Sequence, residues 1–192
     1  MKQEVEIEFK NILTKKQYNT LLNIIPFQKT TMNENYYFET KDFKLAKVKS
    51  ALRIRKNDKA YTLTLKQPKE GYVLETNIPL TEEEALSCLK GNFIQHDEFT
   101  KYLSSLGIRP DELHYFGKLI TKRKTYYDGE NLYVLDHSFY NDKEDFELEL
   151  EVQNREKGLK LFTKILNETN IERKKTPSKI ERFFKSLNNL NR

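Results

Sequence analysis

The sequence contains almost no cysteine and few glycines or prolines, and each shortage excludes a class of protein. Of 192 residues only one is cysteine, so an internal disulfide cannot form. We expect Cys88 to be a buried structural thiol, because no Cys–His pairing is present to activate it. Six glycines and five prolines argue against a low-complexity tract, and no glycine-rich loop for nucleotide phosphates is found.

Long apolar runs are also missing. The longest are Leu21-Leu22 and the stretch 24–27, which Asn23 separates. Neither resembles a signal peptide or a membrane-spanning helix, so we predict a cytoplasmic protein with no membrane partner.

Charge is abundant. The chain has 34 Lys and Arg against 29 Asp and Glu, a net charge of +5, together with 12 Phe and 11 Tyr. A 37% hydrophobic content with this many aromatics predicts one folded domain over residues 1–192. This net positive charge is too small to indicate binding to the phosphate backbone of a nucleic acid, so no nucleic-acid partner is predicted.

Hydrophobic periodicity predicts an α+β chain of around eight strands with helices packed outside. Capping boxes at Thr14 and Thr81 begin two helices, and Thr176-Pro177 is predicted to begin the closing helix. Turn pairs at 57–58 and 128–129 predict two hairpins. The predicted strands are 4–10, 32–38, 51–55, 61–66, 71–79, 119–127, 132–139 and 146–152; the other helices are near 97–107 and 158–168.

Alternation along these strands separates acidic, basic and apolar faces. Carboxylates share one face of the first and last strands, whereas cations share a face of the middle strands. The acidic set is Glu4, Glu6, Glu8, Glu147, Glu149 and Glu151, and the basic set is Arg53, Arg55, Lys66 and Arg123, with Lys10 ending the first acidic row.

Two interpretations of these faces remain open. They are either the solvated side of an ordinary sheet or the inner lining of a closed antiparallel eight-stranded barrel. A lining of this kind needs a highly charged ligand, because buried charges must be paired or bound to metal. Polyphosphate with Mg²⁺ or Mn²⁺ satisfies both sets of charges.

Several motifs follow one another along the chain: Glu6-Ile-Glu8-Phe-Lys10, Tyr37-Phe38-Glu39-Thr40, Leu52-Arg53-Ile54-Arg55, Thr64-x-Lys66, Thr121-x-Arg123, Leu135-Asp136, Glu147-x-Glu149-x-Glu151 and Ser178-Lys179. Their order resembles that of the CYTH, or triphosphate tunnel metalloenzyme, superfamily. The likeness spans nearly the whole chain and is nearest to the short single-domain Gram-positive type. Two features depart from the family pattern: Glu39 stands where the family more commonly has Asp, and we expect no helical domain of the kind appended to some bacterial members.

The resemblance implies roles for individual residues. The divalent metal, Mg²⁺ or Mn²⁺, would be held by Glu6, Glu8, Asp136, Glu149 and Glu151, of which the four glutamates are also the catalytic candidates; Glu147 and Glu75 are weaker candidates. The triphosphate would be bound by Lys10, Arg53, Arg55, Lys66, Arg123 and Lys179.

The resemblance also implies a metal-dependent triphosphatase, and we expect inorganic tripolyphosphate to be its substrate. Three alternatives stay open: an adenylate cyclase or organic triphosphatase on the same site, a non-catalytic polyphosphate-binding module, and a plain β-sheet interaction protein. The sequence leaves the oligomeric state open, with a homodimer among the alternatives. The three histidines have no metal-ligand spacing.

Overall fold

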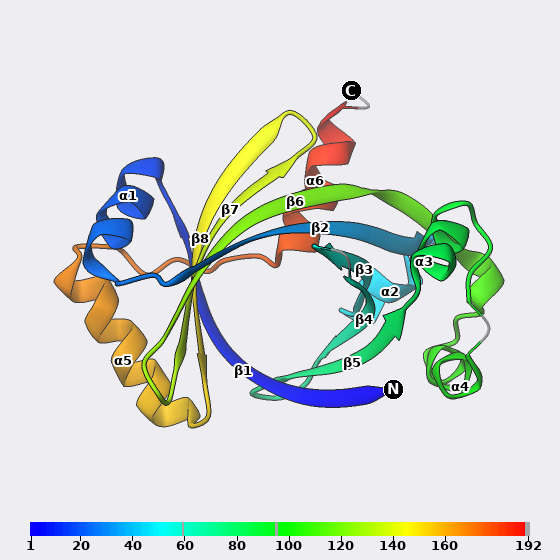
Figure 1. Ribbon diagram of the computed structural model, residues 1–192, viewed down its shortest axis with the longest axis horizontal. Coiled ribbons are helices and arrows are strands. Elements are labelled where there is room, and N and C mark those ends of the chain that lie inside the picture. The colour runs from blue at the N-terminus through cyan, green and yellow to red at the C-terminus, as the bar shows by residue number, and fades with distance from the viewer. Residues whose placement is uncertain (59, 95, 191–192) are drawn as a thin grey trace. The chain divides into compact units, whose positions relative to one another are not determined.

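A computed structural model of the chain describes residues 1–58, 60–94 and 96–190. Its eight strands form a closed barrel in the order β1-β5-β4-β3-β2-β6-β7-β8 (Figure 1), which confirms the predicted α+β barrel. The strands are β1 Lys2–Leu13, β2 Lys29–Thr40, β3 Ala51–Asn57, β4 Ala60–Pro68, β5 Val73–Leu80, β6 Leu113–Tyr127, β7 Leu132–Tyr140 and β8 Lys143–Val152. The helices are α1 Lys15–Ile24, α2 Lys44–Lys47, α3 Glu82–Leu89, α4 Asp97–Ser105, the 3-10 turn η1 Pro110–Glu112, α5 Arg155–Glu168 and α6 Lys179–Leu190.

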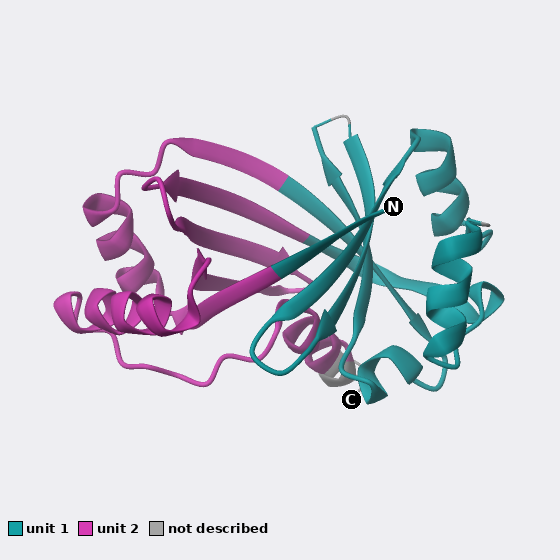
Figure 2. Cartoon of the chain, turned by 90° about the horizontal axis from the view of Figure 1, so that it is seen from below, with its two compact units in different colours: residues 1–5, 33–119 teal, residues 6–32, 120–192 magenta. Residues whose placement is uncertain are grey.

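The chain divides into two compact units (Figure 2). Unit 1 comprises residues 1–5 and 33–119, and unit 2 comprises residues 6–32 and 120–192. The long strands β1, β2 and β6 contribute residues to both. The expectation of one domain over the whole chain stays a prediction.

The core of unit 1 lies between its strands and the helices α3 and α4. Leu52 and Ile54 of β3 are fully buried in one cluster with Leu63 of β4, Phe99 and Leu103 of α4. Since side chains alternate along a strand, residues 53, 55 and 57 of β3 occupy the opposite face, away from these helices.

The core of unit 2 packs α1 and α5 against β1, β7 and β8. Phe9 and Leu148 cluster with Leu21 of α1 and Phe162 of α5. A Cβ atom at Gly158 of α5 would lie 2.5 Å from Cγ2 of Val152, so only glycine lets this helix approach the last strand so closely. The charged residues of β1 and β8 therefore lie on the face turned away from α1 and α5.

Both predicted capping boxes are present. The Thr14 hydroxyl accepts from the amide of Gln17, and the Thr81 hydroxyl accepts from the amide of Glu84. In turn, the side chains of Gln17 and Glu84 accept from the backbone amides of Thr14 and Thr81. These local signals could be predicted because they need only residues three apart.

The predicted start of the closing helix was wrong. Helix α6 begins at Lys179, two residues later than a Thr176 cap with Pro177 at the first position would require. The Thr176 hydroxyl instead accepts a hydrogen bond of 2.8 Å from the amide of Ile12. Ser178 caps the helix, with its Oγ accepting from the amide of Glu181.

Glu39 has a structural role that explains its place in the motif. Its carboxylate, 1% exposed, accepts from the amides of Thr40, Leu45 and Ala46 at 2.8, 3.0 and 2.9 Å. It thereby satisfies the amino-terminal amides of the short helix α2, which the sequence pattern did not predict. None of the helices in the described parts of the chain is long and apolar enough to cross a membrane.

Candidate functional site

Strand register in unit 2 brings charged residues from distant parts of the sequence into neighbouring positions. Across the β1–β8 pair Glu8 lies opposite Glu151 and Lys10 opposite Glu149. In the β7–β8 pair Asp136 lies opposite Glu147. Directly opposed side chains have Cβ atoms about 4.5–5.5 Å apart, so each pair interacts strongly.

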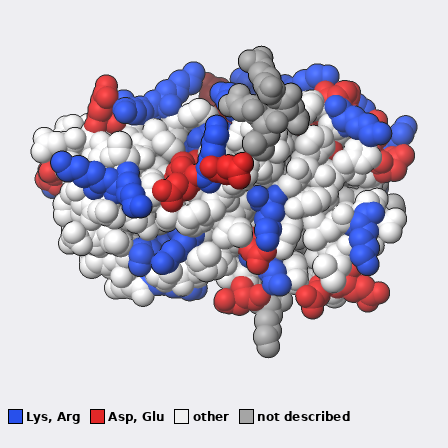
Figure 3. Space-filling model, turned by 90° about the horizontal axis from the view of Figure 1, so that it is seen from above, with Lys and Arg blue, Asp and Glu red and all other residues white. Residues whose placement is uncertain are grey.

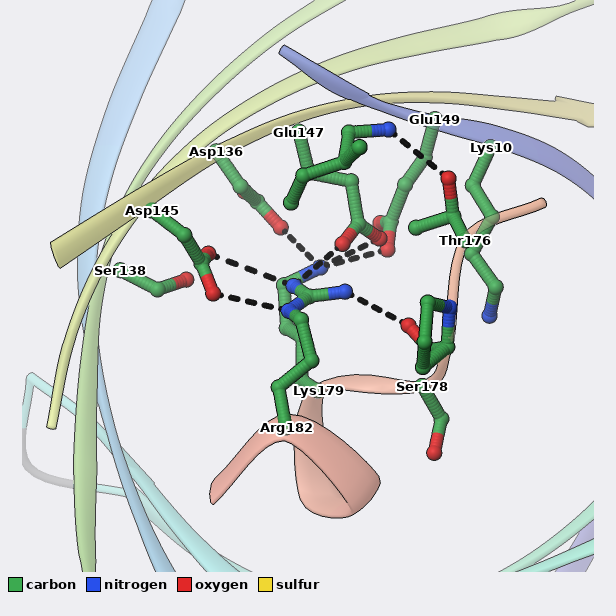
Figure 4. A network of polar contacts seen from close by, with 12 residues as sticks. Lys10, Asp136, Ser138, Asp145, Glu147, Glu149, Thr176, Ser178, Lys179 and Arg182 are labelled. Atoms are coloured by element: carbon green, nitrogen blue, oxygen red, sulfur yellow. Dashed lines mark hydrogen bonds and ion pairs between the residues drawn. The ribbon is translucent and has the colours of Figure 1, made fainter. Parts of the chain in front are cut away.

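Lys179, at the start of α6, lies at the centre of these carboxylates (Figure 4). Its ammonium nitrogen is 2.9 Å from Asp136, 3.0 Å from Glu147 and 2.6 Å from Glu149. An ammonium group has three N–H donors, so these three carboxylates use its full capacity. Lys179 is therefore the shared counter-ion of the buried acidic cluster.

Arg123 on β6 binds the same cluster from another strand. Its Nε and Nη2 donate to the two oxygens of Asp136 at 2.9 and 2.7 Å, a bidentate pair, and Nη2 also donates to Glu149 at 2.7 Å. Asp136 is fully buried. The described contacts leave Nη1 of Arg123 as the part of this guanidinium that a ligand can approach.

Arg182 is a member of the network that the sequence analysis missed. Its guanidinium contacts Glu147, donates to Asp145 at 2.8 Å from Nε, and donates to the carbonyl of Pro177 at 2.6 Å. The Tyr140 hydroxyl also donates to Asp145, at 2.6 Å. One signal was available and was not used: residues three apart on a helix share a face, which places Arg182 beside Lys179.

Burial and ion pairing act in opposite directions on these carboxyl groups. Burial raises the pKa of Asp136, but the charges of Arg123 and Lys179 outweigh it and hold that pKa below the ordinary value. The pKa of Glu149 is likewise held well below its usual range, because Lys179 and Arg123 outweigh its burial. For Glu147, burial and the neighbouring Glu149 prevail and raise the pKa to about 7.

Glu6, Glu8 and Glu151 lie beside this network, half-buried on the same strand faces. Glu8 pairs with Lys10 at 2.6 Å. Within residues 1–58, 60–94 and 96–190, no group of three or more His, Cys, Asp or Glu side chains is already arranged as a metal site. The chemistry of the donors nevertheless fits a hard divalent ion, because all of them are carboxylate oxygens in adjacent registers.

The predicted cations of unit 1 lie on the face of the sheet opposite its helices. Arg55 donates from Nε to Asn35 at 2.9 Å, and Lys66 forms an ion pair with Glu75. Arg53 differs from both, because its buried Nε has no hydrogen-bond partner among the described residues. A buried donor without a partner costs about 1–3 kcal/mol, and an anionic ligand would remove that cost.

His137 and Cys88, which the sequence analysis also considered, do not belong to the charged site. His137 packs its ring 4.3 Å from that of Phe146 and pairs with Glu144 at 2.7 Å. Cys88 is buried, and burial raises the pKa of its thiol. On the surface shown in Figure 3, Lys and Arg are interspersed with Asp and Glu and do not gather into one large field of a single sign.

Known proteins resemble this chain over nearly its full length. A Bacillus subtilis protein named "Putative triphosphatase YjbK" is 38% identical over 186 residues, which are 96% of each chain. The crystal structure of a "putative adenylate cyclase" from Bacillus halodurans superposes with a TM-score of 0.90 at 36% identity, covering 96% of this chain and 100% of that one. A Hippeastrum protein described as a "putative adenylyl cyclase" with a dominant triphosphatase activity has a TM-score of 0.79 at 23% identity, covering 95% of this chain and 96% of that one, and shows the shared fold alone.

The family match agrees with the strand order, the register and the placement of the charged residues described above. Residues 4–184 match the CYTH domain, which begins at the first acidic strand and ends within α6. The chain therefore belongs to the CYTH domain family.

Proposed function

We propose that this protein hydrolyses triphosphates with the help of a divalent metal ion, with inorganic tripolyphosphate as its substrate. Family membership and the 38% identical relative named as a triphosphatase support the reaction class. The observation that carries the proposal is the buried cluster of Asp136, Glu147 and Glu149 around Lys179, bounded by Arg123. Clusters of buried charged groups with strongly shifted pKa values are typical of functional sites.

In this proposal Glu6, Glu8, Glu149 and Glu151 hold Mg²⁺ or Mn²⁺. The ion would neutralise charge that develops on the phosphoryl oxygens. Asp136 was predicted to join these ligands, but both of its oxygens contact Arg123 and one also contacts Lys179. The two oxygens of Glu149 are engaged by the same Arg123 and Lys179, so these contacts do not separate the two residues, and Asp136 stays a proposed metal ligand with the four glutamates.

The triphosphate would be bound by cations from both ends of the motif series. The proposed ligands are Lys10, Arg53, Arg55, Lys66, Arg123 and Lys179. Two of them are supported by particular observations: Arg53 has a buried unpartnered Nε, and Arg123 keeps Nη1 outside its contacts with carboxylates. Guanidinium groups suit this role because their planar donors match phosphate oxygens.

The chain's own groups can carry the remaining chemistry. A water oriented by a carboxylate attacks the terminal phosphorus in line, a new P–O bond forms, and the bridging P–O bond breaks. The electron pair leaves with the diphosphate, and the arginine and lysine donors stabilise the charge on it. The products are orthophosphate and diphosphate.

Phosphate release tests the proposal directly. Tripolyphosphate, ATP, thiamine triphosphate and pyrophosphate are each incubated with Mg²⁺, Mn²⁺ or chelator. We expect release from tripolyphosphate only with metal, and none from the Glu6→Ala variant. Glu156→Ala is the matched control, because Glu156 forms an exposed ion pair on α5. Absence of release from a folded protein across the panel would overturn the proposal.

The 36% identical Bacillus halodurans protein makes cyclase activity the second candidate. A cyclase would convert ATP into cyclic AMP and pyrophosphate without releasing orthophosphate, so product analysis of the ATP sample separates the two. A polyphosphate-binding module would instead bind tripolyphosphate and release nothing with any metal.

A further inference from the structure

One face of α6 anchors this helix on β7 and on the β7–β8 turn, within unit 2. Residues four and seven apart on a helix share a face, so Lys179 lies on the same side as Phe183 and Ser186. Phe183 is fully buried, and its ring lies 6.3 Å from that of Tyr140 at the end of β7. The side-chain amide of Asn141, in the turn, donates to Oγ of Ser186. Packing and hydrogen bonding therefore fix the part of this face that lies beyond the first turn of α6.

Arg182 fixes the beginning of the helix, where Lys179 lies. Its Nε and Nη2 donate to the two oxygens of Asp145 at 2.8 and 3.3 Å, and its Nη1 donates to the carbonyl of Pro177 at 2.6 Å. Nη2 also forms an ion pair with Glu147 (Figure 4). One planar guanidinium thus joins strand β8 to the backbone that immediately precedes α6.

Asp145, two residues before Glu147 on β8, holds the guanidinium of Arg182 in place. Its Oδ2 also accepts from the Tyr140 hydroxyl at 2.6 Å. The side chains of Arg182 and Asp145 are only 12% and 13% exposed, so salt in the solvent screens their attraction weakly. A bidentate pair of this kind fixes the plane of the guanidinium as well as its charge.

Glu147 is shared between Arg182 and Lys179, with one cation on each carboxylate oxygen. Arg182 contacts Oε2, and the ammonium nitrogen of Lys179 donates to Oε1 at 3.0 Å. Lys179 keeps its other N–H donors for Asp136 and Glu149. Without Arg182, the buried Oε2 would have no cation, and it would draw the ammonium group toward Glu147 and away from the other two carboxylates.

We propose that Arg182 is a positioning residue, which holds the ammonium group of Lys179 in the place from which it binds the triphosphate. The inference rests on the proposed function, in which Lys179 is one of the substrate-binding cations. The guanidinium of Arg182 uses donors on all three of its nitrogens for Asp145, Glu147 and Pro177. Arg182 therefore acts on the substrate through Lys179.

The position of Lys179 is measured first, in the absence of substrate. A buried, hydrogen-bonded ammonium group exchanges its protons slowly enough to give a proton–nitrogen NMR signal, and the Lys179→Met variant identifies the signal of Lys179. We expect this signal to be shifted or lost in Arg182→Met and in Arg182→Lys. Lys185→Met is the matched control, because Lys185 lies on the same helix in an exposed ion pair with Glu181. An unchanged Lys179 signal in both Arg182 variants would overturn the inference.

Binding of tripolyphosphate then tests whether Arg182 acts through Lys179. Affinity is measured by calorimetry with Ca²⁺, and the tripolyphosphate is checked to be intact afterwards. We expect Arg182→Met to bind about tenfold more weakly than the parent, and Lys179→Met to lose at least as much, since a charge-assisted hydrogen bond is worth about that factor. Adding Arg182→Met to Lys179→Met should weaken binding by less than about twofold, because residues that act through one another are not additive. A further tenfold loss in the double variant would overturn the inference.

Arg182→Lys keeps the test decisive where Arg182→Met does not fold. It retains a positive charge beside Asp145 and Glu147, but one ammonium nitrogen cannot reproduce the planar fork of a guanidinium. We expect this variant to bind tripolyphosphate about threefold more weakly than the parent and more strongly than Arg182→Met. Parent affinity in a folded Arg182→Met would overturn the inference, and where that variant does not fold, parent affinity in Arg182→Lys would do so.

Phosphate release by the parent protein with Mg²⁺ is measured in parallel. Release together with unchanged affinity in the Arg182 variants would remove the inference and leave the proposed function standing. A parent protein that neither binds nor hydrolyses tripolyphosphate would remove the proposed function, and the NMR signal would still decide whether Arg182 positions Lys179.

Discussion

The charged faces of the two units satisfy their charges in different ways. In unit 2 the cations Arg123, Lys179 and Arg182 all contact buried carboxylates. In unit 1, by contrast, Arg53 keeps a buried Nε and Asn57 a buried Oδ1 without hydrogen-bond partners among the described residues. The cations of the first face are thus paired with carboxylates in the folded protein, whereas the second face retains buried hydrogen-bonding groups that a ligand can use.

This difference separates stability from binding. Substitutions in the unit 2 network break contacts already made in the folded protein, so they should change the free energy of unfolding. Substitutions at the unpartnered groups of unit 1 break no hydrogen bond among the described residues, so they should weaken ligand binding without lowering the free energy of unfolding. The four predictions below test that separation, beginning with the largest effect.

Arg123→Met should destabilise the protein by about 3–5 kcal/mol, because it leaves the fully buried Asp136 without its bidentate partner. Urea unfolding measures the change. Lys160→Met is the control, since Lys160 forms an exposed ion pair with Glu156 and should cost less than about 1 kcal/mol. Equal stability of the two variants would contradict the claim that the unit 2 network is structural.

Glu149→Gln should lower phosphate release from tripolyphosphate by about 100-fold or more, a loss of roughly 2.7 kcal/mol in transition-state stabilisation. The variant should still fold, because Lys179 keeps its contacts with Asp136 and Glu147. Steady-state release with Mg²⁺ is the measurement, and Glu156→Gln provides the control. Full turnover would refute the role proposed for Glu149.

Arg53→Met should weaken tripolyphosphate binding by about tenfold, or 1.4 kcal/mol, without lowering the unfolding midpoint. The reason is that its buried Nε makes no hydrogen bond with the described residues, so the substitution removes an unpaired donor. Arg109→Met serves as the comparison, because Arg109 is exposed and forms a surface ion pair with Asp111. A large loss of stability in Arg53→Met would erase the contrast between the two faces.

The smallest effect is expected at Asp128, a carboxylate outside the unit 2 network, and concerns the pH dependence of stability. The pKa of Asp128 is lowered to about 2, because bonds from the amides of Asn131 and Glu130 outweigh the effect of burial. A lowered folded pKa stabilises the protein above the unfolded value of 3.8, and this stabilisation is lost as pH falls toward 2. The difference in melting temperature between the parent and Asp128→Asn should therefore be present at pH 6 and shrink at pH 2. A difference that does not change with pH would contradict this origin.

Sequence reasoning predicted the features that depend on short spacing. The capping boxes at Thr14 and Thr81 and the alternation in β1 and β8 follow from residues two or three apart. The order of motifs then placed the acidic and basic faces correctly on their strands. The closed barrel itself is shown by the strand order.

Features that depend on contacts distant in sequence could not be predicted. Thr176 has the pattern of a helix cap, yet its hydroxyl is used by Ile12, 164 residues earlier. The complete engagement of Lys179 by three carboxylates is likewise a tertiary property. The unpartnered Oδ1 of Asn57 could not be recognised either, because an Asn at the end of a strand is common beside a hairpin turn.

The segment between α5 and α6 has a consequence for how the protein is made. Asn11 on β1 binds the carbonyl of Glu172 and the amide of Lys174, the latter 163 residues away. A ribosome adding about 5–20 residues per second needs roughly 8–30 s to make that stretch. For most of this interval β1 lacks β8, the strand that places Glu151 opposite Glu8 and Glu149 opposite Lys10, so the charged face of β1 is synthesised long before this partner strand.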